Sequence, residues 1–167
     1  MGDTTRWLSA DQQRAWRALY LGTTLLKDRL DADLQREFDL SLPEYEVLVR
    51  LSEADGSLRM AQLADAMAHS RSRVTHTIKR MEGAGLVERS TSTDDGRGVV
   101  ARLTDKGMDL LVRAAPVHVA GVRDYLVDLV PADDFAAVGR VFDTVSDRLV
   151  GLHPNAEMRN PPGSPSD

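Results

Sequence analysis

The stretch Met60-Ala-Gln-Leu-Ala-Asp-Ala-Met67, followed by Ala68-His-Ser-Arg-Ser-Arg-Val-Thr-His-Thr-Ile-Lys-Arg80, decides the fold of this chain. Both parts carry apolar residues at three- and four-residue spacing, which predicts two short helices joined by a turn. At about 100° of rotation per residue, Val74, Ile78 and Met81 fall on one side of the second helix. That side can pack on the first helix, which leaves the opposite side free for a partner.

The second helix is expected to run from about residue 71 to residue 84. Ser70 can cap its first turn, and Gly85 supplies a residue that tolerates positive φ after its end. A helix with one apolar edge and one basic, small-polar edge fits a DNA major groove. Taken alone, a basic helix face is also typical of plain solvated surface. The stretch from residue 68 to residue 80 contains no acid and holds six cations and histidines: His69, Arg71, Arg73, His76, Lys79 and Arg80.

A hairpin follows this helix. Residues 86–90 and 99–103 read as two short strands, and residues 91–98 are rich in Asp, Ser, Thr and Gly, which favour turns. Within that loop Asp95 is close enough in sequence to orient the guanidinium of Arg97. An arginine at a hairpin tip suits a narrow minor groove, where negative potential is concentrated. A helix-turn-helix with such a wing predicts double-stranded DNA as the partner, unless Arg97 is only a loop cation.

The sequence predicts a different contact for each kind of side chain. Ser72, Thr75 and His76 are expected at base edges, and Arg73 at guanine or phosphate. The two cations Lys79 and Arg80 are expected at the DNA backbone. The complete predicted DNA-binding set is Ser70, Arg71, Ser72, Arg73, Thr75, His76, Lys79, Arg80, Asp95 and Arg97.

These motifs carry a resemblance to a known family. Met60-Ala-Gln-Leu-Ala, Arg71-Ser-Arg-Val-Thr, Arg80-Met-Glu-Gly-Ala-Gly-Leu-Val-Glu-Arg89, Asp95-Gly-Arg97 and Leu103-Thr-Asp-Lys-Gly107 together resemble the MarR family of winged helix-turn-helix regulators. The resemblance implies a mainly α fold, or α+β with a small three-stranded wing sheet, with N- and C-terminal dimerisation helices. It also implies a homodimer on a pseudo-palindromic operator that represses a nearby gene and is released by a small molecule or an oxidant.

Upstream of the helix pair the chain reads as helical. Residues 8–38 carry an apolar stripe at helical spacing. Ser41-Leu-Pro-Glu44 then forms a capping box ahead of a second helix, because it combines an N-cap serine, a first-turn proline and a glutamate three residues on. Ser57-Leu-Arg59 is expected as the third strand of the winged sheet.

Downstream, Thr104 can cap a helix that Pro116 is expected to interrupt with a kink, with a resumption over 117–130. Pro131 begins a last helix whose apolar stripe is too wide for one neighbour. Surplus apolar helices at both termini predict a homodimer, although packing within one chain is the alternative. The expected segments are a disordered N-terminus (1–7), an N-terminal dimerisation helix (8–40), a winged lobe (41–107, with the recognition helix at about 71–84 and the wing at about 86–103), C-terminal dimerisation helices (108–152) and a disordered tail (153–167).

The resemblance also implies an effector site. In this family ligands often lodge where the dimerisation helices meet the DNA-binding lobe. Trp16, Arg17, Tyr20, Tyr45 and Val49 are the candidates to line such a cleft, where a small aromatic or phenolic acid would stack on Trp16 and pair with Arg17. Packing in the core or at a dimer interface is the alternative role for the aromatic residues.

Composition narrows the remaining possibilities. The chain has 167 residues, a net charge of −5 and no cysteine, so one globular unit without disulfides or thiol-based sensing is expected. No membrane span, secretory signal, nucleotide loop or metal-ligand spacing is present, which favours a cytoplasmic protein that is not an enzyme and needs no cofactor or metal. Acids concentrate between residues 124 and 147, away from the basic helix. The alternative function is a winged-helix module that binds an acidic protein without specific DNA binding.

Overall fold

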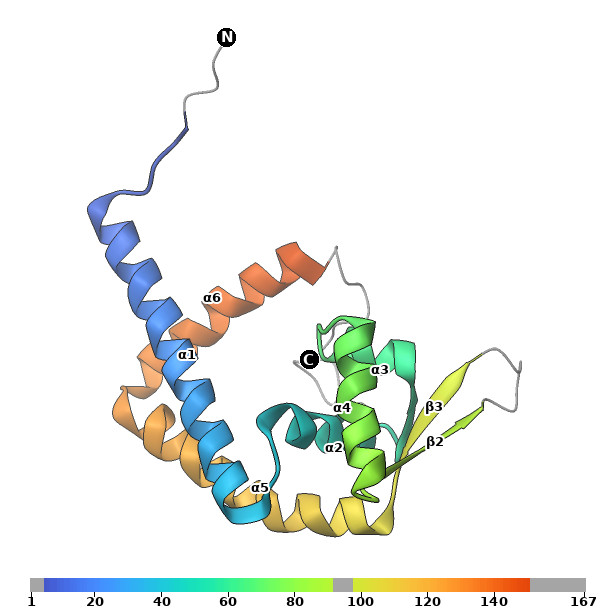
Figure 1. Ribbon diagram of the computed structural model, residues 1–167. Helices are drawn as coiled ribbons and strands as arrows, with labels where there is room; N and C mark the ends of the chain where they lie inside the picture. Colours follow the sequence, from blue (N-terminus) through green and yellow to red (C-terminus); the bar gives the residue numbers. More distant parts are fainter. Residues whose placement is uncertain (1–4, 92–97, 151–167) are drawn as a thin grey trace.

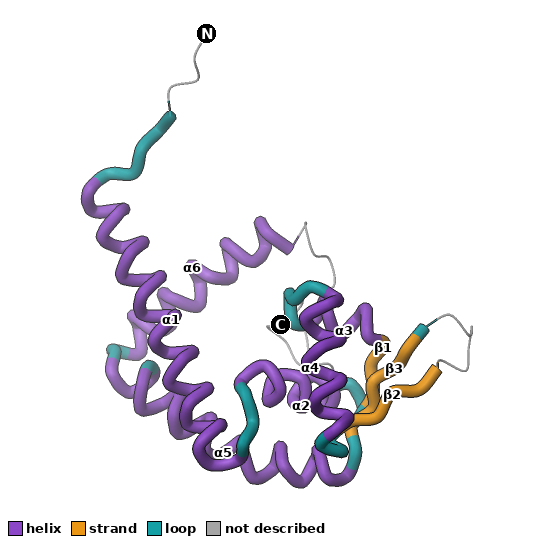
Figure 2. Tube along the Cα trace, in the orientation of Figure 1, coloured by secondary structure: helices purple, strands orange, loops and turns teal. Residues whose placement is uncertain are grey.

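The computed structural model describes residues 5–91 and 98–150. Figures 1 and 2 show a winged lobe at one end of the molecule and an arm of long helices at the other. Within the described ranges the elements follow the order that the sequence predicts. They are α1 (Ala10–Phe38), α2 (Leu42–Glu53), β1 (Ser57–Arg59), α3 (Met60–Ala66), α4 (Arg71–Gly83), β2 (Val87–Thr91), β3 (Val99–Leu103), α5 (Asp105–Tyr125), a 3-10 turn (Val127–Leu129) and α6 (Ala132–Val150).

The wing sheet is antiparallel with β3 in the centre, in the order β1-β3-β2. Ala101 on β3 lies opposite Leu58 on β1 and opposite Arg89 on β2. Ala101 is completely buried, as expected for the middle residue of a central strand that packs on a helix. The predicted third strand at residues 57–59 is therefore confirmed.

The core of the winged lobe is built from α2, α3, α4 and the sheet, closed by the end of α1 and the first turns of α5. Each helix contributes apolar residues at helical spacing, so the lobe buries one side of every element. The largest fully buried side chains are Leu34, Leu40, Val47, Leu48, Leu51, Leu63, Val74, Ile78, Met81 and Val87.

The Leu-Thr-Asp-Lys-Gly motif fastens the start of α5 to the end of α4. The Thr104 hydroxyl donates to the carbonyl of Gly85 at 2.8 Å and accepts from the amide of Gly107 at 3.0 Å. The backbone of Gly107 packs closely against the carbonyl of Leu86. A Cβ at this position would lie 2.2 Å from that oxygen, so only glycine fits. The motif therefore holds the end of α4 and the start of α5 together.

The end of α1 docks on the end of α5 through a buried carboxylate. Asp33 accepts a hydrogen bond of 2.7 Å from the hydroxyl of Tyr125 and another of 2.7 Å from Arg36. The guanidinium of Arg29 donates to the same tyrosine oxygen at 3.2 Å. The hydrogen bond from Tyr125, followed by that from Arg36, holds the pKa of Asp33 below its ordinary value.

The helix α5 is not interrupted at Pro116, contrary to the sequence expectation. It runs from Asp105 to Tyr125 with Pro116 inside it, and it ends before the expected limit at residue 130. Pro116 lies on an exposed side of the helix, whereas Ala114, two residues before it, is completely buried. The kink expected at Pro116 stays a prediction.

The arm exposes two apolar surfaces. No residue of α1 before Leu30 is buried, and none of the described side chains of α6 is buried either. The expected disordered tail at 153–167 and residues 1–4 lie outside the described ranges. The large exposed apolar side chains of α1 and α6 are Trp16, Leu19, Tyr20, Leu21, Leu25, Phe135, Val138, Val141, Phe142, Val145 and Leu149.

Candidate nucleic-acid interface

The helix α4 presents one polar face to solvent. Ser70 caps the helix by accepting from the amide of Arg73 at 3.3 Å. Val74, Ile78 and Met81 are buried, as the spacing predicts, and they anchor the helix to the lobe. The opposite face is consequently held outward on a rigid support.

Eight of the ten predicted DNA-binding residues lie at exposed positions on this helix or its cap. Their stretch carries no acid until Glu82, so the face is uniformly polar or cationic. The remaining two, Asp95 and Arg97, lie outside the described part of the chain. The eight that the structure brings together are Ser70, Arg71, Ser72, Arg73, Thr75, His76, Lys79 and Arg80.

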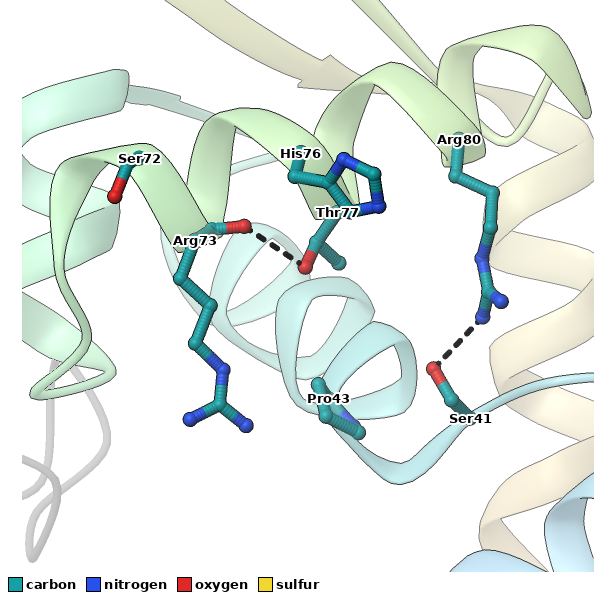
Figure 3. Close-up of a pocket in the computed structure, with 7 residues that line it drawn as sticks. All are labelled: Ser41, Pro43, Ser72, Arg73, His76, Thr77 and Arg80. Atoms are coloured by element: carbon teal, nitrogen blue, oxygen red, sulfur yellow. Dashed lines mark hydrogen bonds between the residues drawn. The ribbon is translucent and has the colours of Figure 1, made fainter.

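An open groove of about 490 Å³ runs between this face and the start of α2. In Figure 3 the guanidinium groups of Arg73 and Arg80 extend from α4 toward Pro43 and Ser41, which form the other wall. His76 stands on the same side of the helix between the two arginines. The cationic side chain of Arg73 on this concave surface is suited to a phosphate backbone.

A second hollow lies on the other side of α4, against the base of the wing. It measures about 370 Å³, and Arg71 and Thr75 face Arg59 and Val99 across it. The wing is also tied to the helix by an ion pair, because Arg89 on β2 donates to Glu82 at 2.6 and 3.0 Å. The helix α4 thus lies between two hollows, one toward α2 and one toward the wing.

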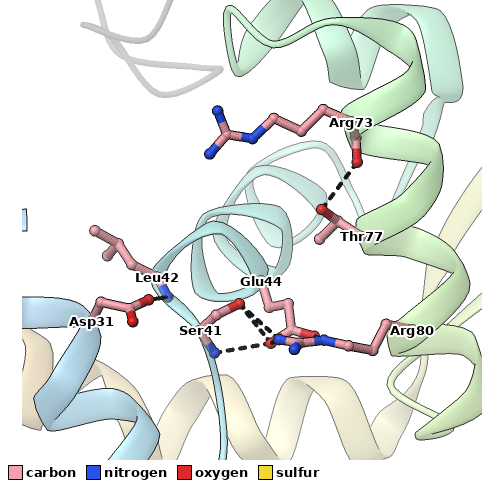
Figure 4. Close-up of polar contacts among 7 residues, drawn as sticks. All are labelled: Asp31, Ser41, Leu42, Glu44, Arg73, Thr77 and Arg80. Carbon is pink, nitrogen blue, oxygen red and sulfur yellow. Dashed lines mark hydrogen bonds and ion pairs between the residues drawn. The ribbon is translucent and has the colours of Figure 1, made fainter. Parts of the chain in front are cut away.

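Arg80 differs from the other cations of this face because it has a strong partner within the chain. Its Nε donates to Oε1 of Glu44 at 2.6 Å, and its Nη2 donates to Oε2 of Glu44 and to Oγ of Ser41, the latter at 3.0 Å (Figure 4). The Glu44 side chain is only 6% exposed. Burial disfavours the charged form of Glu44, but the hydrogen bonds from Arg80 and Ser41 outweigh burial, so its pKa lies below the ordinary value.

Sequence reasoning missed this pair. Glu44 and Arg80 are 36 residues apart, so no local spacing connects them. The sequence assigned Glu44 only to the capping box of α2. That assignment is confirmed, because the backbone amide of Ser41 donates to the Glu44 carboxylate at 2.9 Å.

The candidate effector residues are divided between two places. Tyr45 and Val49 line a cavity of about 180 Å³ between α2 and α5, together with Leu42, Glu46, Arg50 and His118. Trp16, Arg17 and Tyr20 are not part of it and lie on the exposed half of α1, where the Trp16 and Tyr20 rings are 6.1 Å apart.

His118 is the functional candidate at this cavity that sequence reasoning did not assign. Its ring lies 4.5 Å from the ring of Tyr45, and its Nδ1 is buried without a hydrogen-bond partner among the described residues. Burial lowers the pKa of His118 and raises that of Glu46. The cavity therefore combines an aromatic wall with polar atoms that can accept a hydrogen bond from a ligand.

Within residues 5–91 and 98–150, no group of three or more histidines, cysteines or carboxylates is placed to hold a metal ion. In the same part of the chain no helix is long and apolar enough to cross a membrane.

Comparison with known proteins gives consistent matches. The sequence profile of the MarR family matches residues 40–99. AbsC from Streptomyces coelicolor, a MarR family transcriptional regulator, is 40% identical with a TM-score of 0.83 over 88% of this chain and 99% of that one. Sco3205 from the same organism, solved in complex with DNA, is 38% identical with a TM-score of 0.84 over 89% of this chain and 93% of that one.

Curated relatives match over shorter segments. YfiV from Bacillus subtilis, an HTH-type transcriptional regulator, is 33% identical over 98 residues, which is 59% of this chain and 60% of that protein. This chain therefore spans less than two thirds of YfiV. Three mycobacterial relatives, 32% identical over 108 residues and matched over 76% of their length, are named transcriptional repressors.

Proposed function

Since this chain belongs to the MarR family of transcriptional regulators, we propose that it binds a pseudo-palindromic operator as a homodimer, represses a nearby gene and is released by a small-molecule effector. The fold and the relatives are those of DNA-binding regulators and not of enzymes. The observation that carries the proposal is the exposed face of α4, which is cationic, free of acids and flanked by two hollows.

The chemistry of this face supports a division of contacts. Ser72, Thr75 and His76 carry hydrogen-bonding groups suited to base edges, and Arg73 can pair with guanine or grip phosphate. Lys79 is suited to the sugar-phosphate backbone. At the wing, Arg97 would enter the minor groove, and Asp95 would orient its guanidinium.

The exposed apolar surfaces of the arm support the homodimer. Trp16 on α1 is 57% exposed and Val141 on α6 is 58% exposed. Large exposed apolar patches mark interaction sites. A two-fold dimer is the commonest oligomer. Two recognition helices would then address half-sites about 34–36 Å apart, one turn of DNA.

The cavity beside His118 supports a small aromatic or phenolic effector. A phenol could stack on Tyr45 and donate a hydrogen bond from its hydroxyl group to Nδ1 of His118, which has no partner among the described residues. The aromatic pair Trp16 and Tyr20 keeps two possible roles, ligand contact or dimer packing. The direction of regulation rests on the resemblance and on the relatives named as repressors.

The test is selection of duplexes from a randomised pool, followed by footprinting of the selected sequence in the promoter beside the gene. We expect a two-fold symmetric footprint that persists in excess non-specific duplex at physiological salt. Protection should disappear when the matching effector from a panel of phenolic and heteroaromatic acids is added. Failure to enrich any sequence would contradict the proposal and would favour the module that binds an acidic protein.

A further inference from the structure

We propose that Arg80 is a positioning residue that orients α4 through Glu44 and does not contact a DNA phosphate. The inference rests on the proposed function, because it concerns the helix that is proposed to read DNA. It also assigns a task to Glu44, a buried carboxylate that the capping box alone does not account for.

The pair of Arg80 and Glu44 has a directional geometry. Arg80 lies in the last turn of α4, and its guanidinium turns back to the first turn of α2, where it donates three hydrogen bonds to Glu44 and Ser41 (Figure 4). A guanidinium facing a carboxylate with two nitrogens fixes direction as well as distance. The apolar anchors of α4, Val74, Ile78 and Met81, are non-directional. Its other directional contacts, through Glu82 and Thr104, lead to the wing and to α5. The pair with Glu44 is therefore the directional contact that orients α4 relative to α2.

The start of α2, which carries Glu44, is also hydrogen-bonded to α1. The amide of Leu42 donates to a carboxylate oxygen of Asp31 at 2.7 Å. The start of α2 is therefore held by α1 on one side and holds α4 on the other. The contact of Asp31 with Leu42 and that of Glu44 with Arg80 both lie in the first turn of α2, so this turn joins α1 to α4 (Figure 4).

Binding of Arg80 to a phosphate would require its guanidinium to leave Glu44, which is unfavourable in free energy. A move of its guanidinium to a phosphate would leave the Glu44 carboxylate, which is 6% exposed, without its cation. An uncompensated buried charge is strongly unfavourable. The preceding residue, Lys79, is exposed and forms no ion pair within the described part of the chain. Lys79 is therefore the better phosphate ligand.

The test uses two conservative variants, Arg80→Lys and Glu44→Gln, with Lys79→Gln as the matched control on the same helix. Arg80→Lys keeps the charge but loses the fork geometry that a carboxylate requires. For each protein, affinity is measured for the duplex selected above and for a scrambled duplex of the same composition. The measurements are made between about 50 and 200 mM salt, the range over which phosphate contacts change affinity most clearly.

We expect Arg80→Lys and Glu44→Gln each to weaken binding to the selected duplex about tenfold, within the range for one lost base contact. The salt slope and the affinity for scrambled duplex should stay as in wild type, since no phosphate contact is lost. The double variant should bind no more weakly than the weaker single variant, because both changes break one pair. Lys79→Gln should weaken binding to both duplexes and flatten the slope by about 0.9 for each lost contact.

Two results would overturn the inference. One is wild-type affinity and a wild-type salt slope for Arg80→Lys, which is the behaviour of a phosphate contact that needs only the charge at this position. The other is tighter binding by Glu44→Gln, which would mean that the carboxylate merely competes with DNA for Arg80. If wild-type protein does not distinguish the two duplexes, the proposed function fails, and this outcome is recognised before any variant is made.

Discussion

His76 lies on the exposed face of α4, between Ser72 and Arg80 along the groove. Its imidazole can donate to or accept from a base edge, whereas the longer side chain of Arg73 can reach either a base or a phosphate. At the scale of single residues, specificity and affinity are thus expected from different side chains. Variants should separate the two properties.

Replacement of His76 by alanine is expected to relax sequence preference without removing DNA binding. Loss of one base contact costs about 1–3 kcal/mol and affects one position in each half-site. The measurement is competition among duplexes that differ at single positions. An equal loss of affinity for all sequences, with a flatter salt slope, would instead place His76 at the backbone.

The exposed and buried positions of α4 could be predicted from sequence, since the helical period sorts Val74 and Ile78 from Ser72 and His76. The partner of Arg80 could not, because Glu44 comes close only after the chain has folded. His118 was missed for a similar reason. It lines a cavity that forms only where α2 and α5 come together.

At the scale of elements, the junction of α4 and α5 depends on a single missing side chain. Gly107→Ala would place a methyl group 2.2 Å from the carbonyl oxygen of Leu86. A backbone atom cannot yield as a flexible side chain does, so we expect destabilisation of at least about 1–3 kcal/mol, the usual cost of overpacking. Urea unfolding of both proteins provides the measurement.

Gly83→Ala is the matched control for that variant. A Cβ at Gly83 meets nothing within 4 Å, and alanine is favoured over glycine in helices by about 0.5–1 kcal/mol. This variant should be neutral or slightly more stable than wild type. Equal unfolding midpoints for the two alanine variants would contradict the close packing of Gly107 on Leu86.

The contact between α1 and α5 predicts a pH dependence. The pKa of Asp33 is lowered in the folded state, so its contribution to stability is present above the ordinary carboxyl pKa and is lost as the pH falls through the lowered value. Tyr125→Phe removes the 2.7 Å hydrogen bond to Asp33 and keeps the ring.

We therefore expect Tyr125→Phe to lower Tm by about 2–4 °C near pH 7, and we expect the difference from wild type to shrink below about pH 4. Thermal unfolding of both proteins, followed by circular dichroism between pH 3 and 7, measures this difference in Tm. A difference that stays constant over this range would show that the hydrogen bond does not act on the ionised carboxylate.

The elements themselves followed from caps and periodicity, including the capping box at Ser41 and the short strand at Ser57. The exception was Pro116, where local propensity predicted an interruption of the helix but α5 continues to Tyr125. The turns before and after this proline contain buried residues, Ala114 and Gly121. Local rules therefore gave the order of the elements but not the length of α5.

At the scale of the whole molecule, the arm has apolar surface that the described part of the chain leaves exposed. Val141→Asp places a charge in the exposed stripe of α6, where Val141 is 58% exposed. Since this residue is not buried within one chain, the fold should persist while the dimer dissociates. Sedimentation should give about 37 kDa for wild type, twice the 18.4 kDa of one chain, and about 18 kDa for the variant.

A wild-type mass of one chain would remove the dimer from the proposal. A variant that remains dimeric would instead move the interface away from α6.

The net charge of −5 is compatible with DNA binding only if the basic face is turned to the duplex. The acids of residues 124–147 lie on the arm, away from that face.

The most direct test of the central claim is the spacing between half-sites. A rigid pair of recognition helices requires two half-sites on the same side of the duplex, so insertion of about 5 bp at the centre of the selected operator, half a turn, should prevent both from binding together. We predict that affinity at physiological salt falls about 100-fold, toward that of a single half-site. Undiminished affinity for the lengthened operator would contradict the paired reading of DNA by α4.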